Sequence, residues 1–363
     1  MTSLSEIVEV VIGVDTHVRT HSAAAVDART GGVLGEVTVE ATPEGYQALV
    51  DFAGAHSLLR AWAVEGTGGH GAGLARLLAR RYELVLELDR PERARRRNGA
   101  KSDPLDAIRA AREALSRAKL GTPRSAGQRQ ALSVLLAARR SAVQAGTDAQ
   151  RQLFSLVIAA PEQLRERFRG QTLPAMTRLA ARLRISPRWD LETATTARVL
   201  RDLARRALEL SDEAARHEKD ILAIVRSWRP DLLAQPGIGP IIAATVLCAW
   251  SHPGRIRSEA AFAMLAGAAP IPASSGQTTT RHRLNRYGDR QLNRALHTAV
   301  LCRLRYDPTT QAYAQRRTTE GKTSREIKRC LIGGLSVVRP ARAVVPRSRR
   351  GMATLPCRCD GQL

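Results

Sequence analysis

Four acidic residues stand where expected structural segments begin or end. Asp15 and Glu65 each close a short apolar run, and Asp103 and Asp106 lie three positions apart in the segment KSDPLDA. Carboxylates are the ligands that Mg²⁺ takes together with substrate phosphates. Two such ions can hold both the attacking and the leaving oxygen of a phosphodiester. The group therefore predicts a metal site for phosphodiester chemistry. Each residue alone is explained as simply by a surface loop, with Asp103 capping a helix.

The N-terminal third alternates apolar runs, turn residues and helical patterns. Val and Ile favour a buried strand around Asp15, and Thr42 followed by Pro43 is typical of a helix start. The pattern predicts strands at 7–15, 21–27, 33–40, 60–65 and 83–88, and helices at 43–54, at 74–81 and from 103 past 115.

This order, three strands followed by helix, strand, helix, strand and helix, is that of the ribonuclease H fold. It predicts an α/β domain over residues 7–116, with Asp15 on a central strand and Glu65 on the adjacent one. Asp103 and Asp106 share one helix face at a spacing of three, so both can point at the same sheet edge.

The charge of the chain points to a polyanionic partner. The chain has 57 Lys and Arg residues against 34 Asp and Glu, a formal net charge of +23, and only five of the cations are lysines. Arginine suits bidentate phosphate contacts, which favours nucleic acid; a GC-rich genome also enriches arginine. No apolar stretch is long enough to cross a membrane and no secretory leader pattern opens the chain, so we expect a soluble cytoplasmic protein.

The rest of the chain is expected to be mainly all-α. Residues 117–230 read as long helices, either an antiparallel coiled-coil arm for self-association or a plain helical spacer. A C-terminal domain is expected over 231–331, opening with QPGIGP, which resembles the hairpin of a helix-hairpin-helix element. There Gly237 and Gly239 would allow close approach to a phosphate, or would only make a tight interhelical turn.

A Ser-Gly loop followed by arginines lies further on. Ser275 precedes Gly276, and a serine placed in this way can be a nucleophile whose attacked phosphate is held by guanidinium groups. Taken alone, Ser-Ser-Gly is a common flexible loop. The arginines that follow are Arg281, Arg283, Arg286, Arg290 and Arg294.

The whole set of motifs resembles a known family. VVIGVDTH, AVEGTG and KSDPLDA, then QPGIGPIIAATVL, AFAMLAGAAPIPASSGQT and RYGDRQLNRALHTAV, look like the DEDD transposases of insertion elements, recombinases that use a bridge RNA to choose target and donor DNA. The resemblance runs in order from about residue 9 to 331.

The resemblance implies a ribonuclease H-like (RuvC-like) domain in which the four acids hold Mg²⁺ or Mn²⁺. It implies that Ser275, rather than Ser274, attacks a DNA phosphate to form a phosphoserine intermediate. It also implies double-stranded DNA and a guide RNA as partners, and a homo-oligomer, a dimer or tetramer.

The chain departs from the family after residue 331. Residues 332–363 are rich in Pro and Arg and contain no acid until Asp360, which indicates a frameshifted or truncated end, or a basic RNA-binding tail. Three other functions stay open: a metal-dependent nuclease or junction resolvase without a covalent step, an inactive nucleic-acid-binding relic, and a sugar-kinase-like ATPase. The arginine excess argues against the ATPase.

Overall fold

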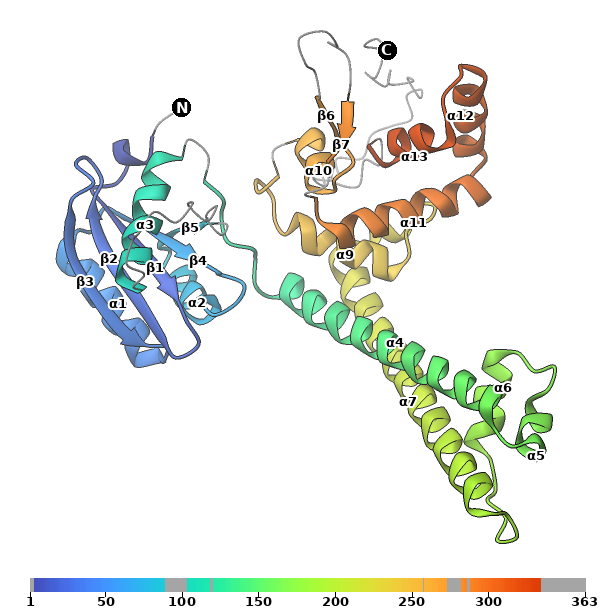
Figure 1. The fold of residues 1–363 in the computed structure, drawn as a ribbon. Coiled ribbons are helices and arrows are strands. Elements are labelled where there is room, and N and C mark those ends of the chain that lie inside the picture. Colours follow the sequence, from blue (N-terminus) through green and yellow to red (C-terminus); the bar gives the residue numbers. More distant parts are fainter. Residues whose placement is uncertain are drawn as a thin grey trace. The chain divides into compact units, whose positions relative to one another are not determined.

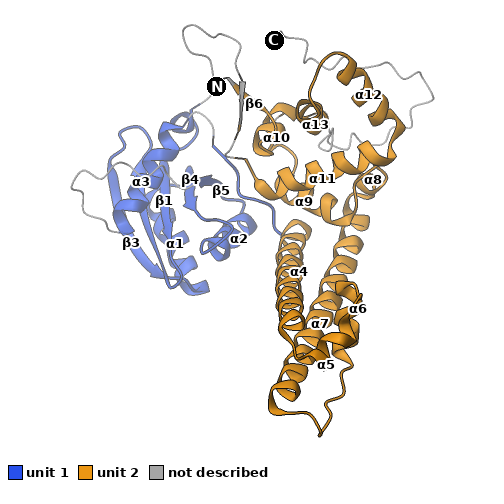
Figure 2. Ribbon diagram, turned by 45° about the vertical axis from the view of Figure 1, so that its right-hand side comes forward, with its two compact units in different colours: residues 1–126 blue, residues 127–363 orange. Residues whose placement is uncertain are grey.

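The chain divides into two compact units, Met1–Ala126 and Gly127–Leu363 (Figure 2). The structure, a computed structural model, describes residues 3–88, 103–117, 120–256, 258–272, 282–285 and 288–333, with the backbone alone given at 270, 272 and 282–284. The irregular tail expected from the sequence lies outside the described residues from residue 334 onward.

The first unit has the strands and α-helices that the sequence predicts, in the predicted order, preceded by a short 3-10 helix that was not predicted. Thr42 caps α1 as expected, because its hydroxyl accepts a hydrogen bond from the Gly45 backbone N–H, and Pro43 opens the helix. The elements are η1 (Leu4–Glu6), β1 (Val10–Thr16), β2 (Thr20–Asp27), β3 (Val33–Glu40), α1 (Pro43–His56), β4 (Arg60–Glu65), α2 (Ala72–Arg80), β5 (Leu84–Leu88) and α3 (Asp103–Ser116).

The five strands form one mixed sheet in the order β3-β2-β1-β4-β5 (Figure 1). The pairs β1/β2 and β2/β3 are antiparallel, whereas β1/β4 and β4/β5 are parallel. Helices cover both faces, which explains why β1 and β4 read as continuous apolar runs rather than as alternating ones. This architecture is consistent with a ribonuclease H-like domain.

The side chains of β1 and β4 alternate between two apolar cores. Ile12, Val14 and Trp62 belong to the core on the side of α1 and α2. Val11 and Ala63 belong to the core against α3, whose Ala110, Ala111 and Ala114 pack there. Odd-numbered residues at the end of β1 and β4 therefore face α3, because successive strand residues point to opposite faces.

The second unit is mostly helical, as the sequence predicts. A two-stranded hairpin is its one sheet among the described residues. The elements are α4 (Gln128–Ala159), α5 (Glu162–Arg165), η2 (Glu166–Phe168), α6 (Leu173–Ala181), α7 (Leu191–Trp228), α8 (Pro230–Leu233), α9 (Pro240–Trp250), α10 (Glu259–Leu265), β6 (Pro270–Pro272), β7 (His282–Leu284), α11 (Arg290–Tyr306), α12 (Pro308–Thr319) and α13 (Ser324–Gly333).

Helices α4 and α7 pack against each other as an antiparallel pair, the arm (Figures 1 and 2). The direction follows from two contacts: Arg139 Nε donates to Glu218 Oε2 at 3.0 Å, and Gly146 lies against Leu210 further along. Residue numbers thus rise along α4 where they fall along α7, so the two helices run in opposite directions. One apolar core lies where α5 and α6 join the pair, and another lies where α9 and α11 pack on its other end.

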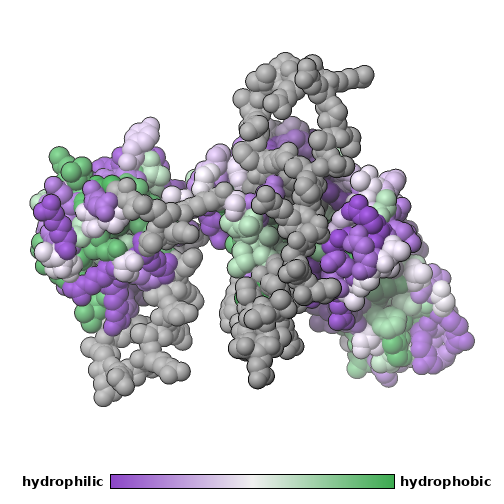
Figure 3. All heavy atoms as spheres, turned by 90° about the horizontal axis from the view of Figure 1, so that it is seen from above, coloured by the Kyte–Doolittle hydropathy of each residue, from purple (hydrophilic) through white to green (hydrophobic). Residues whose placement is uncertain are grey.

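Apolar side chains remain exposed along the arm. Phe154 is 45% exposed, Ile158 57% and Leu191 84%. Hydrophobic patches interrupt the hydrophilic surface on the face of the molecule shown in Figure 3. No helix within the described ranges is long and apolar enough to cross a membrane.

Candidate metal site

Two of the four acids follow paired positions on parallel neighbouring strands. The register of β1 with β4 ends at Val14 opposite Val64, so Asp15 and Glu65 are the next residues on the two strands. Both have odd numbers and fall on the face that α3 covers. Parallel strands end at the same sheet edge, which places these two residues side by side at the carboxyl end of the sheet.

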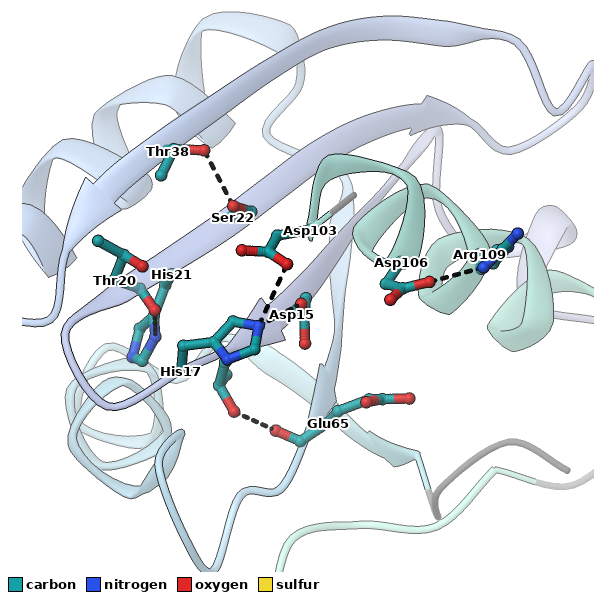
Figure 4. Close-up of polar contacts among 11 residues, drawn as sticks. Asp15, His17, Thr20, His21, Ser22, Thr38, Glu65, Asp103, Asp106 and Arg109 are labelled. Carbon is teal, nitrogen blue, oxygen red and sulfur yellow. Dashed lines mark hydrogen bonds and ion pairs between the residues drawn. The ribbon is translucent and has the colours of Figure 1, made fainter. Parts of the chain in front are cut away.

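The other two acids come from the first turn of α3, which lies unusually close to β1. Gly13 makes this approach possible: a Cβ there would lie 2.0 Å from the Ala107 carbonyl oxygen and 2.7 Å from the Ala111 nitrogen. Any side chain at position 13 would therefore force the helix away. Because Gly13 is two residues before Asp15, the first turn of α3 with Asp103 and Asp106 lies over the end of β1 (Figure 4).

His17 joins Asp15 to Asp103. Its Nε2 lies 3.0 Å from Asp15 Oδ2 and 3.4 Å from Asp103 Oδ1. One ligand atom from each of the three residues lies within 4.8 Å of the other two. Asp15 is buried, whereas the side chains of His17 and Asp103 are about half exposed (50% and 49%), so the group opens to solvent on one side.

Asp106 and Glu65 lie beside this group. Asp106 Oδ1 pairs with Arg109 NH1 at 2.7 Å. The backbone carbonyl of Glu65 accepts a hydrogen bond of 3.0 Å from the Thr16 hydroxyl, which ties the ends of β1 and β4 together. Figure 4 shows the four acids and His17 around the same end of the sheet.

The electrostatics of Asp15 fit a site that attracts a cation. Burial raises the pKa of the Asp15 carboxyl, the neighbouring His17 lowers it, and the charges of Asp103 and Asp106 raise it again, with a net upward shift from 3.8. A buried carboxyl among other carboxylates is stabilised in its ionised form by a cation. The arrangement can therefore bind a divalent ion at an edge open to substrate.

Sequence reasoning missed His17 and Arg109. The signal for His17 was present, because residues i and i+2 of an extended segment point to the same face and His17 stands two residues after Asp15, directly after the last residue of β1. Arg109 stands three residues after Asp106 on α3, the spacing at which helical side chains meet.

The glycine hairpin of the second unit is packed against a helix. Gly237 has a φ of +74°, and a Cβ there would lie 2.7 Å from the Ala299 carbonyl oxygen on α11. Arg303 on α11 donates to the Pro236 carbonyl at 2.8 Å. Gly239 has no atom within 4 Å of such a Cβ and precedes the first residue of α9.

The Ser-Gly loop lies outside the described residues, and so do Ser275, Arg281 and Arg286. Arg283 is in β7, where the backbone alone is described. Arg290 and Arg294 are exposed one turn apart on α11, which Asp289 caps through its carboxylate.

Two family models match the chain, one over most of the first unit together with α4 and the other over part of the second unit. Residues 12–159 match a transposase domain of the DEDD type found in IS110 elements, and residues 231–315 match the transposase IS116/IS110/IS902 family. These two segments are similar to those of an IS110/IS116/IS902-family transposase. The first match includes all four acids and His17.

Two proteins to which the chain is similar are proteins of insertion elements. The chain is 29% identical over 178 residues to the "Insertion element IS900 uncharacterized 42 kDa protein" of Mycobacterium paratuberculosis, which covers 48% of this chain and 44% of the relative. It is 29% identical over 133 residues to the "Insertion element IS110 uncharacterized 43.6 kDa protein" of Streptomyces coelicolor, covering 36% and 33%. The chain thus spans less than half the length of either relative in these matches.

Proposed function

We propose that the chain is the DNA transposase of an insertion element, cutting and rejoining DNA through a metal site and a serine nucleophile. The observation that carries the proposal is the meeting of Asp15 and Asp103 at one sheet edge, within the segment that matches a DEDD transposase domain. These residues are 88 positions apart, and a packing glycine brings their elements together.

In this proposal Asp15, Glu65, Asp103 and Asp106 hold Mg²⁺ or Mn²⁺. A divalent ion bound there supplies charge stabilisation at the phosphodiester oxygens. The fit rests on the donor set: four carboxylates from β1, β4 and α3, of which Asp15 is buried and has a raised pKa. The Asp106–Arg109 ion pair is exposed on the side of Arg109 (63%), so Asp106 can exchange this partner for an ion at little cost.

The serine step is a transesterification. The Ser275 Oγ attacks the phosphorus and forms a P–O bond, while the bond from phosphorus to one deoxyribose oxygen breaks. The hydroxyl proton of Ser275 leaves with that oxygen, directly or through solvent. A DNA hydroxyl later attacks the phosphoserine, restores the phosphodiester and returns Ser275 to its free form. Because no bond is hydrolysed, the ends can be rejoined without an energy source.

The proposed partners follow from charge and shape. Arg281, Arg283, Arg286, Arg290 and Arg294 would contact DNA phosphates, with Arg290 and Arg294 exposed on one face of α11. If the Gly237–Gly239 hairpin contacts a phosphate as in a helix-hairpin-helix element, Gly239 would make the contact. Gly237 instead packs on α11. A guide RNA is the second polyanion that a net charge of +23 can bind.

Recombination joins four DNA strands, so we propose a homodimer or tetramer. The exposed apolar side chains along the arm, such as Ile158 and Leu191, support association through α4 and α7. Size-exclusion chromatography with light scattering tests this, and a monomer at all concentrations would contradict it.

The experiment for the proposed function is a search for protein joined covalently to DNA. The full chain is expressed together with the DNA that flanks its gene and run on a denaturing gel, beside Ser275→Ala, Ser274→Ala and Asp15→Asn. We expect an adduct in the wild type and in Ser274→Ala, and none in the other two variants. An adduct that persists in Ser275→Ala would refute the serine step. Metal-dependent nicking without any adduct would instead establish a nuclease.

A further inference from the structure

The nitrogen of His17 occupies a distinctive position in the acidic site. Nε2 contacts the buried Asp15 carboxylate from β1 and the Asp103 carboxylate from α3, at 3.0 and 3.4 Å. A single ring atom thus faces two of the four carboxylates from which the proposed metal site is built. The side chain is half exposed, so it is not held there by burial.

These separations match those between neighbouring ligands of one metal ion. With metal–ligand bonds of about 2.1 Å, adjacent ligands at right angles lie about 3.0 Å apart and opposite ones about 4.2 Å apart. The Nε2 atom, an Asp15 oxygen and an Asp103 oxygen all lie within 4.8 Å of one another. An ion at the centre of the group would need only small side-chain movements.

The backbone around His17 is fixed by the fold. The His17 N–H donates to the Thr20 carbonyl at 3.0 Å, in the turn that joins β1 to β2. Asp15 is held in the sheet opposite Ser22, and Asp103 is held by the close packing of α3 on Gly13. Asp15 and Asp103 are therefore positioned by regular elements and His17 by the turn that follows β1, which favours a preformed site.

We propose that His17 is a nitrogen ligand of the divalent ion and that it biases the site toward Mn²⁺ over Mg²⁺. This inference rests on the proposed function for the presence of a metal. Mg²⁺ takes oxygen ligands almost exclusively, whereas imidazole adds affinity for transition metals. A site with one imidazole and two or more carboxylates therefore favours Mn²⁺ over Mg²⁺ in affinity more than a site of carboxylates alone does.

The contact between His17 and the carboxylates has another explanation, a simple ion pair. An ion pair requires an imidazolium or an Nε2–H donor, and a bound metal would displace it. A ligand requires a neutral ring with the Nε2 lone pair directed at the metal. The two therefore differ in whether the His17 nitrogen is bonded to the metal once the ion is present.

Pulsed electron paramagnetic resonance of the full chain loaded with Mn²⁺ separates them. A directly bound imidazole gives a ¹⁴N modulation, which disappears from wild-type protein labelled with ¹⁵N-histidine. We expect the modulation in the wild type and in His70→Ala, a matched exposed histidine of the same unit, and its loss in His17→Gln. We expect the Mn²⁺ affinity of His17→Gln to fall at least about tenfold, and its Mg²⁺ affinity to fall less.

The outcomes distinguish this inference from the proposal on which it rests. Mn²⁺ that binds the wild type at an Asp15-dependent site without ¹⁴N modulation would overturn the role of His17 and leave the transposase proposal standing. Failure of Mn²⁺ to bind the wild type more tightly than Asp15→Asn would overturn the metal site itself. Because the wild-type spectrum decides the first point, a misfolded variant would not obscure it.

Discussion

Replacing Gly13 by alanine should separate the two halves of the acidic site. The new Cβ would lie 2.0 Å from the Ala107 carbonyl oxygen, and ordinary contact begins at 3.4 Å, so α3 must retreat by about 1.4 Å. The obstructing atoms are backbone, so no side-chain rotation can relieve the clash. Asp103 and Asp106 would move with α3, away from Asp15, which stays in place on β1.

Overpacking of this kind costs about 1–3 kcal/mol in unfolding free energy. A displacement of about 1 Å in a reacting group can cost about 100-fold in rate, and we expect Mn²⁺ affinity to fall at least about tenfold. Thermal unfolding without metal and Mn²⁺ titration measure the two effects. Gly54→Ala is the control: it lies in α1 with only an arginine side-chain atom near its Cβ, and it should stabilise the fold by up to about 1 kcal/mol. A Gly13→Ala protein as stable as the wild type, with unchanged Mn²⁺ affinity, would refute the packing argument.

Three other substitutions test other parts of the structure. Asp15→Asn should raise the melting temperature of the metal-free protein at neutral pH: burial raises the pKa of Asp15 above 3.8, so the folded state loses stability as the carboxyl ionises. Thermal melts should show this gain vanish below the unfolded pKa of 3.8, and a lower melting temperature at pH 7 would contradict it. Arg60→Met leaves the largely buried Glu83 without its guanidinium partner, and chemical unfolding should show a loss of about 3–5 kcal/mol; a loss below about 1 kcal/mol would be the contrary result. Gly237→Ala should destabilise the second unit, whereas Gly239→Ala should leave the melting temperature unchanged, because only Gly237 has a positive φ and a backbone atom in its way; equal melting temperatures would count against that packing.

Local signals in the sequence were sufficient for the elements of the first unit. The apolar run before Asp15 and the Thr42–Pro43 helix start are decided by neighbouring residues, and the structure confirms both. The helical middle was also predictable, since its prolines fall between helices or in a first helical turn: α4 ends just before Pro161, and Pro174 lies in the first turn of α6.

Long-range packing was not predictable from local patterns. No local pattern around Gly13 indicates that α3, about 90 residues later in the chain, packs close to its Cα. This packing brings Asp103 close to Asp15. The same holds for Gly237, which fits the phosphate-binding pattern locally but packs on α11. The order of the strands came from resemblance to a known fold, because strand periodicity gives a strand's faces but not its neighbours.

The most direct test of the proposed function is metal-dependent cleavage of DNA that contains the ends of the element, with RNA transcribed from the flanking sequence present. Single variants Asp15→Asn, Glu65→Gln, Asp103→Asn and Asp106→Asn are compared with Asp51→Asn, an exposed acid on α1. We predict strand cleavage by the wild type and by Asp51→Asn only when Mg²⁺ or Mn²⁺ is added, and a loss of at least about 100-fold in each of the other four. Cleavage that survives Asp15→Asn, or that proceeds equally well in the presence of a chelator, would contradict a transposase that works through this acidic site.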